Sequence, residues 1–277
     1  MNDNFWIIEG TLLASYEENK NDTIVTIPNG IKVIGEEAFA ASLNIKEIII
    51  PNTVIKIEAS AFEGCSSLEK INLPNSITKI GNHAFWGCES LKEIHLPNNI
   101  KTIEGCTFEE CTSLETVNIP NSVKSIGPYA FYNTPWLDSI KEKNNLAIIN
   151  NILIDGKNCS GIVNIPNGVL VISDSAFRDC KNITSITMPN TLKSIGSYAF
   201  YNCKNLTETN IPSSVTKIGN GAFSNCINLK TINIPDNIIN NIHVNKTTFE
   251  GCNNIINAPM KLKKKLLKYK FGNKSIP

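Results

Sequence analysis

The chain has 277 residues, of which 42% are hydrophobic and 18% are charged, a balance that excludes an intrinsically disordered protein. Its formal net charge is +1, so long-range electrostatics gives no reason to expect nucleic acid or an anionic membrane as the main partner. No apolar run approaches the roughly 18 residues of a membrane helix, so we predict no transmembrane segment.

Residues 1–21 precede the regular part of the sequence, and we expect them to form a strand or a hairpin-like cap. The apolar run at 5–8 is too short for the core of a signal peptide. The sequence therefore predicts either an intracellular protein or one whose export segment was removed.

A repeat of 23 residues follows, marked by a proline after an apolar residue and by a phenylalanine. One gap of 46 residues equals two periods, and the final phenylalanine comes 26 residues after the previous one, which predicts an insertion near Asn240 and Asn241. The marker residues are Pro28, Pro51, Pro74, Pro97, Pro120, Pro166, Pro189, Pro212 and Pro235, with Phe39, Phe62, Phe85, Phe108, Phe131, Phe177, Phe200, Phe223 and Phe249.

Each repeat predicts one coil of a solenoid. The segment from Leu68 to Leu73 alternates as a strand with one buried face does, and Pro74 ends that strand because proline cannot donate to a ladder. We expect Gly81 to supply permissive backbone dihedrals, and the Ala84–Phe85 step to form a small turn or short helix that places a ring in the core. The predicted fold is an α/β-type, mostly β repeat solenoid whose strands pair in a parallel sheet.

The sequence divides into a first array at 22–136, a degenerate coil at 137–159, a second array at 160–254 and a basic amphipathic C-terminal cap at 255–277. In the degenerate coil, Lys143 and Ile154 replace the marker proline and phenylalanine. Its residues 149–154 resemble residues 8–13, so each array is expected to open with a strand-rich or hairpin-like unit. The Thr134-Pro135-Trp136 step favours an irregular turn. Apolar residues that keep the frame are Leu137, Ile140, Leu146, Ile149, Leu153 and Ile154.

The pattern I-P-x-x-[IV]-x-x-I-G-x-x-A-F-x-x-C, over about residues 22–254, resembles the BspA-like (treponemal-type) leucine-rich repeats. The resemblance implies a right-handed solenoid with a parallel sheet on its concave face. It also implies protein–protein recognition, often adhesion by a surface-exposed or secreted protein.

Seven of the nine cysteines stand three residues after a marker phenylalanine, and only Cys106 and Cys159 lie elsewhere. The periodicity favours small apolar residues stacked from coil to coil over disulfides or a metal cluster. Ser42 and Thr134 fill the same slot, the odd cysteine count favours reduced thiols, and no C-x-x-C pair suggests zinc. The cysteines of this row are Cys65, Cys88, Cys111, Cys180, Cys203, Cys226 and Cys252.

The three histidines, His83, His95 and His243, form no recognisable catalytic constellation, and there is no glycine-rich phosphate loop. We therefore predict a binding protein that is not an enzyme and needs no cofactor or metal.

Binding is expected at the outward positions of the strand face, with a protein as the ligand. A ladder of asparagine amides along the stack is the structural alternative for part of this surface. The predicted residues are Glu69, Lys70, Asn72, Lys92, Glu93, His95, Glu115, Thr116, Asn118, Thr187, Asn210 and Asn233.

A second predicted surface is aromatic and would serve a glycan-binding adhesin. It consists of Trp86, Tyr132 and Tyr201, which follow the marker phenylalanine directly. Packing over the coil edge is the alternative for these side chains, and a purely structural or assembly role is the alternative for the whole chain.

The C-terminal segment 261–270 is rich in lysine, and Leu262, Leu266 and Tyr269 share one helical face. We expect these apolar side chains to cover the last coil, as solenoid caps do. A membrane surface or an acidic partner is the alternative for this helix.

Overall fold

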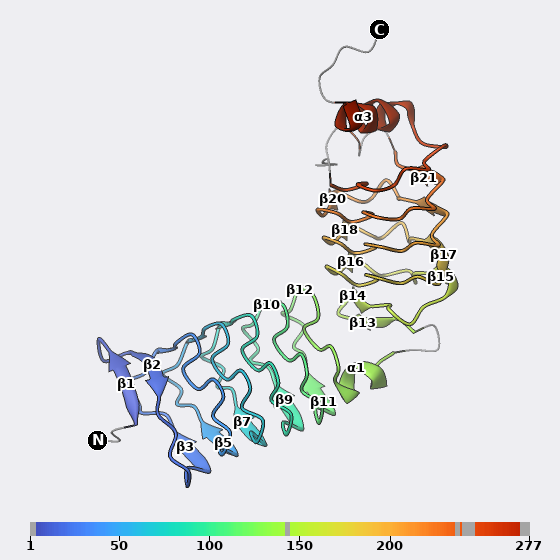
Figure 1. Cartoon of the computed structure of the whole chain (residues 1–277). Coiled ribbons are helices and arrows are strands. Elements are labelled where there is room, and N and C mark those ends of the chain that lie inside the picture. The colour runs from blue at the N-terminus through green and yellow to red at the C-terminus, as the bar shows by residue number, and fades with distance from the viewer. Residues whose placement is uncertain (1–3, 142–144, 236–238, 240–246, 272–277) are drawn as a thin grey trace. The chain divides into compact units, whose positions relative to one another are not determined.

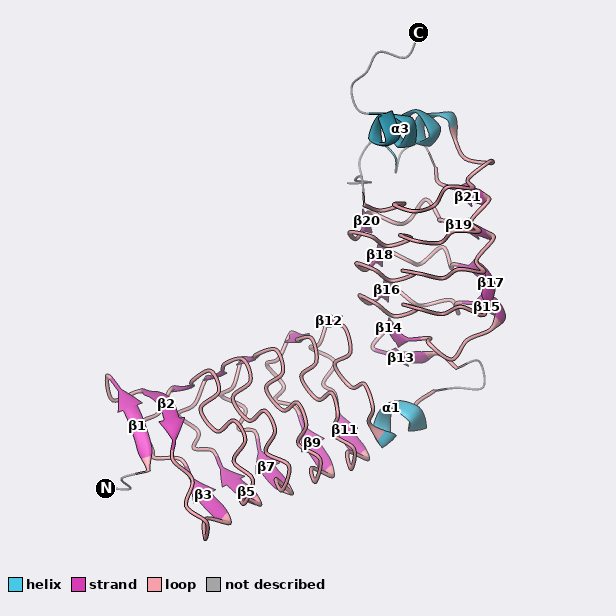
Figure 2. Cartoon of the chain, viewed as in Figure 1, coloured by secondary structure: helices cyan, strands magenta, loops and turns pink. Residues whose placement is uncertain are grey.

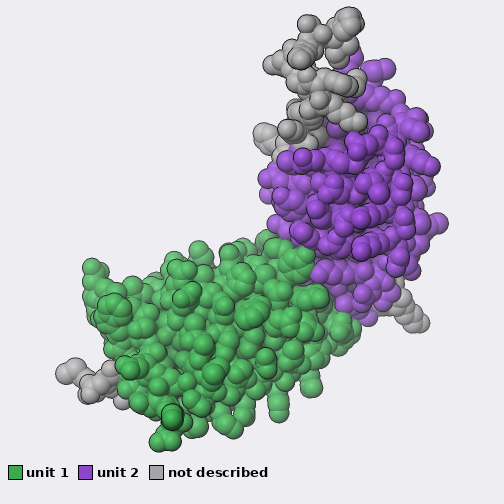
Figure 3. All heavy atoms as spheres, in the orientation of Figure 1, with its two compact units in different colours: residues 1–140 green, residues 141–277 purple. Residues whose placement is uncertain are grey.

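The computed structural model describes residues 4–141, 145–235, 239 and 247–271. It divides into two compact units, unit 1 at Met1–Ile140 and unit 2 at Lys141–Pro277 (Figure 3). The insertion predicted near Asn240 and Asn241, Lys143 and His243 all lie outside the described residues.

Each coil contributes a strand of about three residues from the L-x-x-I-x-L segment, as the repeat predicts. Paired residues differ by one period, as Glu47 and Lys70 do, and the pairing is parallel. Figure 1 shows these long strands side by side in each unit. They are β3 Ile24–Thr26, β5 Glu47–Ile49, β7 Lys70–Asn72, β9 Glu93–His95 and β11 Thr116–Asn118 in unit 1, and β15 Gly161–Asn164, β17 Ile183–Thr187, β19 Glu208–Asn210 and β21 Thr231–Asn233 in unit 2.

A second strand of two residues lies just before the glycine position of each coil, and the sequence did not predict it. These short strands pair in parallel with those of neighbouring coils, so most coils are joined at two places. They are β4 Val33–Ile34, β6 Lys56–Ile57, β8 Lys79–Ile80, β10 Thr102–Ile103 and β12 Ser125–Ile126 in unit 1, and β16 Val171–Ile172, β18 Ser194–Ile195 and β20 Lys217–Ile218 in unit 2. The pairing is interrupted between β8 and β10, as it is between β7 and β9.

Both units open with an antiparallel hairpin, β1 Phe5–Ile8 with β2 Leu12–Tyr16 in unit 1 and β13 Ala147–Ile149 with β14 Ile152–Asp155 in unit 2. The turns, Glu9-Gly10 and Asn150-Asn151, have a positive φ at both residues, as hairpin turns of type I′ require. The second strand of each hairpin joins the short-strand sheet in parallel.

Residues 137–159, expected as one degenerate coil, are divided between the two units. The irregular turn expected at Thr134-Pro135-Trp136 is instead the start of helix α1, Pro135–Ser139 (Figure 2). Thr134 accepts a hydrogen bond from the Leu137 amide, and proline at the first helical position costs the helix no bond.

The core of unit 1 is a column of stacked phenylalanines with ring centroids 5.2–5.4 Å apart. Tyr16 continues the column at one end, 5.0 Å from Phe39, and Trp136 of α1 closes the other, 4.6 Å from Phe131. The Ala-Phe segment is a turn and not a helix, because alternate amides donate to the next coil and not to their own segment, as the Phe62 amide donates to the Ala84 carbonyl.

Gly81 was predicted to supply permissive backbone dihedrals, but its φ is not positive, so another constraint requires glycine there. A Cβ on Gly81 would lie 2.5 Å from the Ala59 nitrogen, so glycine is required by the close approach of the neighbouring coil's backbone. The positive φ angles fall two residues before and two after the phenylalanine, as at His83 and Gly87.

Helix α3, Met260–Phe271, follows the last described coil of unit 2 (Figure 2). Leu262 is fully buried in the core of this unit, and Leu266 packs against that core. These contacts cover the end of the stack, which would otherwise expose apolar side chains to water.

Candidate binding surfaces

The long-strand sheet of unit 1 presents nine of the predicted binding residues, and all nine are exposed. Strands β9 and β11 place Glu93 beside Thr116 and His95 beside Asn118. Val117 and Ile94 lie between them and face the core, so the alternation of the strand turns the polar side chains outward.

Two ion pairs cross between β5 and β7 at one end of this face. Lys46 lies 3.0 Å from Glu69, and Lys70 lies 2.7 Å from Glu47. Such exposed pairs stabilise a fold by at most about 1 kcal/mol, and they occupy two of the predicted binding residues.

The other end of the face differs, because no described residue forms an ion pair with Lys92, Glu93, His95 or Glu115. These polar and charged side chains keep their hydration in the free protein and are accessible to a ligand of complementary charge.

In unit 2, Thr187, Asn210 and Asn233 form one exposed column across β17, β19 and β21. The asparagine ladder has no support in the described hydrogen bonds, since none joins the side-chain amides of Asn72, Asn118, Asn210 or Asn233 to one another. These amides face solvent and can meet a ligand.

The predicted aromatic row is split between the units. Trp86 and Tyr132 belong to unit 1 and are 36% and 42% exposed, whereas Tyr201 belongs to unit 2 and is half-buried. The Arg178 guanidinium lies 4.6 Å from the centre of the Tyr201 ring, so a cation already covers that ring. A sugar could not stack on that side of Tyr201, which disfavours a glycan site there.

All nine cysteines are reduced, and eight are buried. The cysteine row has a role beyond packing, because each thiol from Cys65, Cys88 and Cys111 donates to the phenylalanine carbonyl of the preceding coil at 3.1–3.2 Å. Each of these carbonyls also accepts a backbone amide, so the sulfur adds a second hydrogen bond that links one coil to the next. The sequence pattern located the row but could not show this bond.

Burial raises the pKa of Cys65 and Cys111 to about 12 and that of Cys88 well above its ordinary value, because the thiolate cannot be hydrated. At pH 8 these groups are therefore neutral thiols. We expect Ellman's reagent to leave the row unmodified in the folded chain and to modify all nine cysteines in guanidinium chloride.

Cys106 is the control, since it is the half-exposed cysteine. Partial burial and the Glu109 carboxylate raise its pKa to about 12 as well, so the accessibility of its sulfur is what distinguishes it from the row. It should react first in the folded chain, and Cys106→Ser should remove that early reaction. Rapid modification of several thiols in folded Cys106→Ser would contradict the buried row.

Among the described residues, no group of three or more histidine, cysteine, aspartate or glutamate side chains could hold a metal ion. Within the same described part, no helix is long and apolar enough to cross a membrane.

The sequence matches the BspA type leucine rich repeat region, in six copies, over residues 32–162 and 155–276. The chain belongs to this family. A search of curated proteins finds no match.

Among solved structures, the chain is similar to a leucine-rich repeat protein from Eubacterium ventriosum, with 23% identity, 88% of this chain and 70% of that chain covered, and a TM-score of 0.52. A leucine rich cell surface protein from Faecalibacterium prausnitzii is 23% identical, with 93% of each chain covered and a TM-score of 0.41. The T. pallidum leucine rich repeat protein is 27% identical, with 70% and 82% covered and a TM-score of 0.46.

Proposed function

We propose that the chain is a non-enzymatic scaffold that binds a protein ligand on the outward face of its long strands. The β9–β11 pair carries the proposal, because hydrogen-bonded strands hold Glu93, His95 and Glu115 exposed and without ion pairs among the described residues. Membership of a leucine-rich repeat family, whose members are generally binding scaffolds and often adhesins, supports it.

A rigid backbone below these side chains favours recognition. Leu91, Ile94 and Leu114 are buried beneath the face, so the polar groups need little ordering when a ligand arrives. Mixed charge on this face favours a ligand surface that carries both signs.

The test begins with a displayed protein library panned against the full chain. Each ligand is then titrated against Glu93→Gln, His95→Ala, Glu115→Gln combined in one variant. We expect affinity to fall by on the order of tenfold or more, as the loss of several interface side chains typically costs 1–2 kcal/mol. The melting temperature should stay within about 2 °C, because exposed side chains contribute little to stability.

A matched control removes the same charges elsewhere, with Glu36→Gln, Asn82→Ala, Glu89→Gln. These three residues are exposed in the turns of unit 1. A ligand whose affinity is unchanged by the first variant, or falls equally with the control, would place its binding site outside β9–β11.

A further inference from the structure

The two units carry opposite charges, which the net charge of +1 conceals. Residues 1–140 contain 9 lysines and 18 acidic residues, a net charge of −9. Residues 141–277 contain 17 basic and 7 acidic residues, a net charge of +10. Such a division provides complementary surfaces within a single sequence.

The acidic charge of unit 1 gathers along its turn edge, defined as the positions from four residues before each marker phenylalanine to four after it, over 35–135. This edge contains eight glutamates and no lysine or arginine. The glutamates are Glu36, Glu37, Glu58, Glu63, Glu89, Glu104, Glu109 and Glu110.

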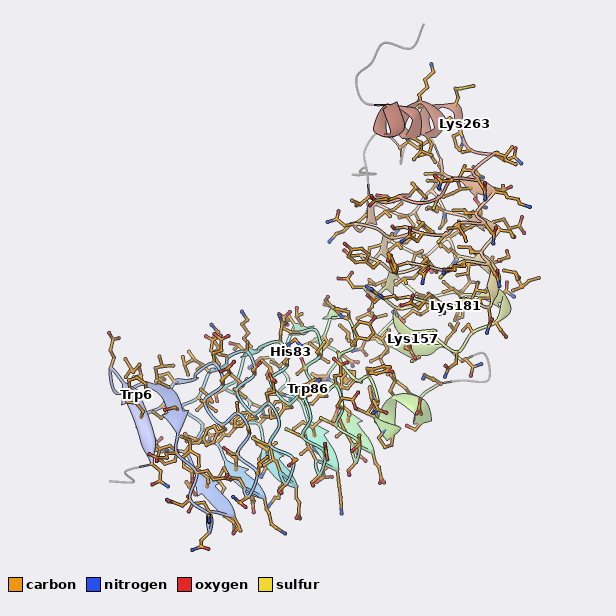
Figure 4. The ribbon with its side chains drawn as sticks, in the orientation of Figure 1. Trp6, His83, Trp86, Lys157, Lys181 and Lys263 are labelled. Carbon is orange, nitrogen blue, oxygen red and sulfur yellow. The ribbon has the colours of Figure 1, made fainter. Side chains whose placement is uncertain are left out.

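One column of this edge alternates carboxylates with exposed rings. The residue directly after the phenylalanine is Glu63, Trp86, Glu109 and Tyr132 in successive coils. The core rings beneath them lie 5.2–5.4 Å apart, so the coils bring Trp86 within one step of a carboxylate on either side. Figure 4 shows Trp86 and His83 on unit 1.

The same column in unit 2 holds a cation. Arg178 directly follows Phe177, and its guanidinium lies 4.6 Å from the Tyr201 ring and 5.9 Å from the Tyr198 ring. Its Nε is also 3.5 Å from Oδ2 of Asp179. This repeat position thus accommodates a cation between an aromatic face and a carboxylate.

In unit 1, no described lysine or arginine lies over the Trp86 ring. Trp86 with Glu63 and Glu109 has the same chemistry as the Arg178 site but lacks its cation. A lysine or arginine from another chain would gain both the ring contact and two carboxylates.

We propose that the Glu63–Trp86–Glu109 column docks lysine side chains from the basic unit 2 of a second copy of this chain. Helix α3, on which Figure 4 labels Lys263, supplies them. Leu262 is buried, whereas Lys261 and Lys264 are exposed and Lys263 is half-exposed. The contact joins different surfaces of the two copies, so it is head-to-tail. It uses a different surface from the one proposed for ligand binding.

The test is sedimentation velocity of the full chain over a concentration series, at about 10 mM and about 500 mM salt, where the Debye length falls from ~30 Å to ~4 Å. We expect the sedimentation coefficient to rise with concentration at low salt and to remain that of a monomer at high salt. A monomer at every concentration in low salt would overturn the proposal.

Charge reversal locates the contact. Glu63→Lys with Glu109→Lys should weaken self-association by on the order of tenfold, and so should Lys261→Glu, Lys263→Glu, Lys264→Glu combined. An equimolar mixture of the two variants should associate more strongly than either variant alone, because the reversed charges of each then complement those of the other. Failure of the mixture would overturn the assignment of the two surfaces.

Controls separate this contact from general charge and from misfolding. Glu9→Lys with Glu17→Lys makes the same change of charge at the exposed N-terminal hairpin and should leave association as in the wild type. Trp86→Ala should weaken association by about three- to fivefold through the lost cation–π contact.

A charge-reversal variant can fail for lack of stability. Where one melts at a lower temperature than the wild type, Glu63→Gln with Glu109→Gln should also weaken association. A monomeric chain that binds a lysine-rich peptide through Trp86 would overturn the second copy as the occupant.

Discussion

Replacing Phe85 with alanine is expected to lower the free energy of unfolding by about 4 kcal/mol. The ring is fully buried, and its centroid lies 5.2 Å from Phe62 and 5.3 Å from Phe108. Its removal leaves a cavity that two further rings border. Because each coil contacts only its neighbours, the gap interrupts the stack of unit 1 at its middle. Urea unfolding followed by far-ultraviolet circular dichroism measures the change.

Trp86→Ala is the matched control, since it removes a larger ring from the next position in the chain. Trp86 is 36% exposed and lies outside the phenylalanine column, so we expect a loss of less than about 1.5 kcal/mol. Phe85→Leu should fall between the two, because leucine refills part of the cavity. Equal losses for Phe85→Ala and Trp86→Ala would show that the column does not stabilise the stack.

The second large effect is expected at Gly81, where alanine should cost about 3 kcal/mol. The added Cβ would lie 2.5 Å from the Ala59 nitrogen, 2.6 Å from the Glu58 carbonyl carbon and 2.8 Å from the Ala59 Cα. These are backbone atoms, so no side-chain rotation relieves the overlap. The neighbouring coils must separate, and they then lengthen the parallel hydrogen bonds of both sheets.

Gly105→Ala serves as the comparison in the same unit. Gly105 does not have a positive φ, and a Cβ there would lie 3.4 Å from its nearest neighbours. We expect its thermal midpoint to be close to that of the wild type or slightly higher, because alanine restricts the unfolded chain. Equal destabilisation by the two substitutions would contradict a requirement specific to Gly81.

The interior of the solenoid could be predicted closely from sequence. A buried ring that stacks on its equivalent in the next coil recurs every 23 residues in the sequence. Phe39, Phe62 and Phe85 show this period clearly, whatever the sequences of the turns between them. The cysteine row could be assigned to packing for the same reason. Its bond to the preceding coil's carbonyl could not, because that acceptor is 26 residues away in sequence.

The predicted surface residues follow directly from strand alternation, and the exposed Glu93, His95 and Asn118 occupy the face expected of them. The sequence could not show which charged side chains of this face form ion pairs. Lys46 pairs with Glu69 and Lys70 with Glu47, whereas Glu93 and Glu115 have no such partner among the described residues, although both strand pairs have the same register of one period.

The coil length, the identity of the core residues and the strand that each proline ends could all be predicted, because they depend on a side-chain pattern repeated along the chain. The remaining features depend on contacts between coils and became visible only in the folded chain. The short strands at positions such as Lys79–Ile80 are too brief to show alternation and exist because neighbouring coils bond to them. Glycine is required at position 81 because the backbone of the neighbouring coil lies too close for a Cβ. The division at 140 arises because Trp136 closes one aromatic column while a hairpin opens the next unit, and both are contacts between coils that no single repeat contains.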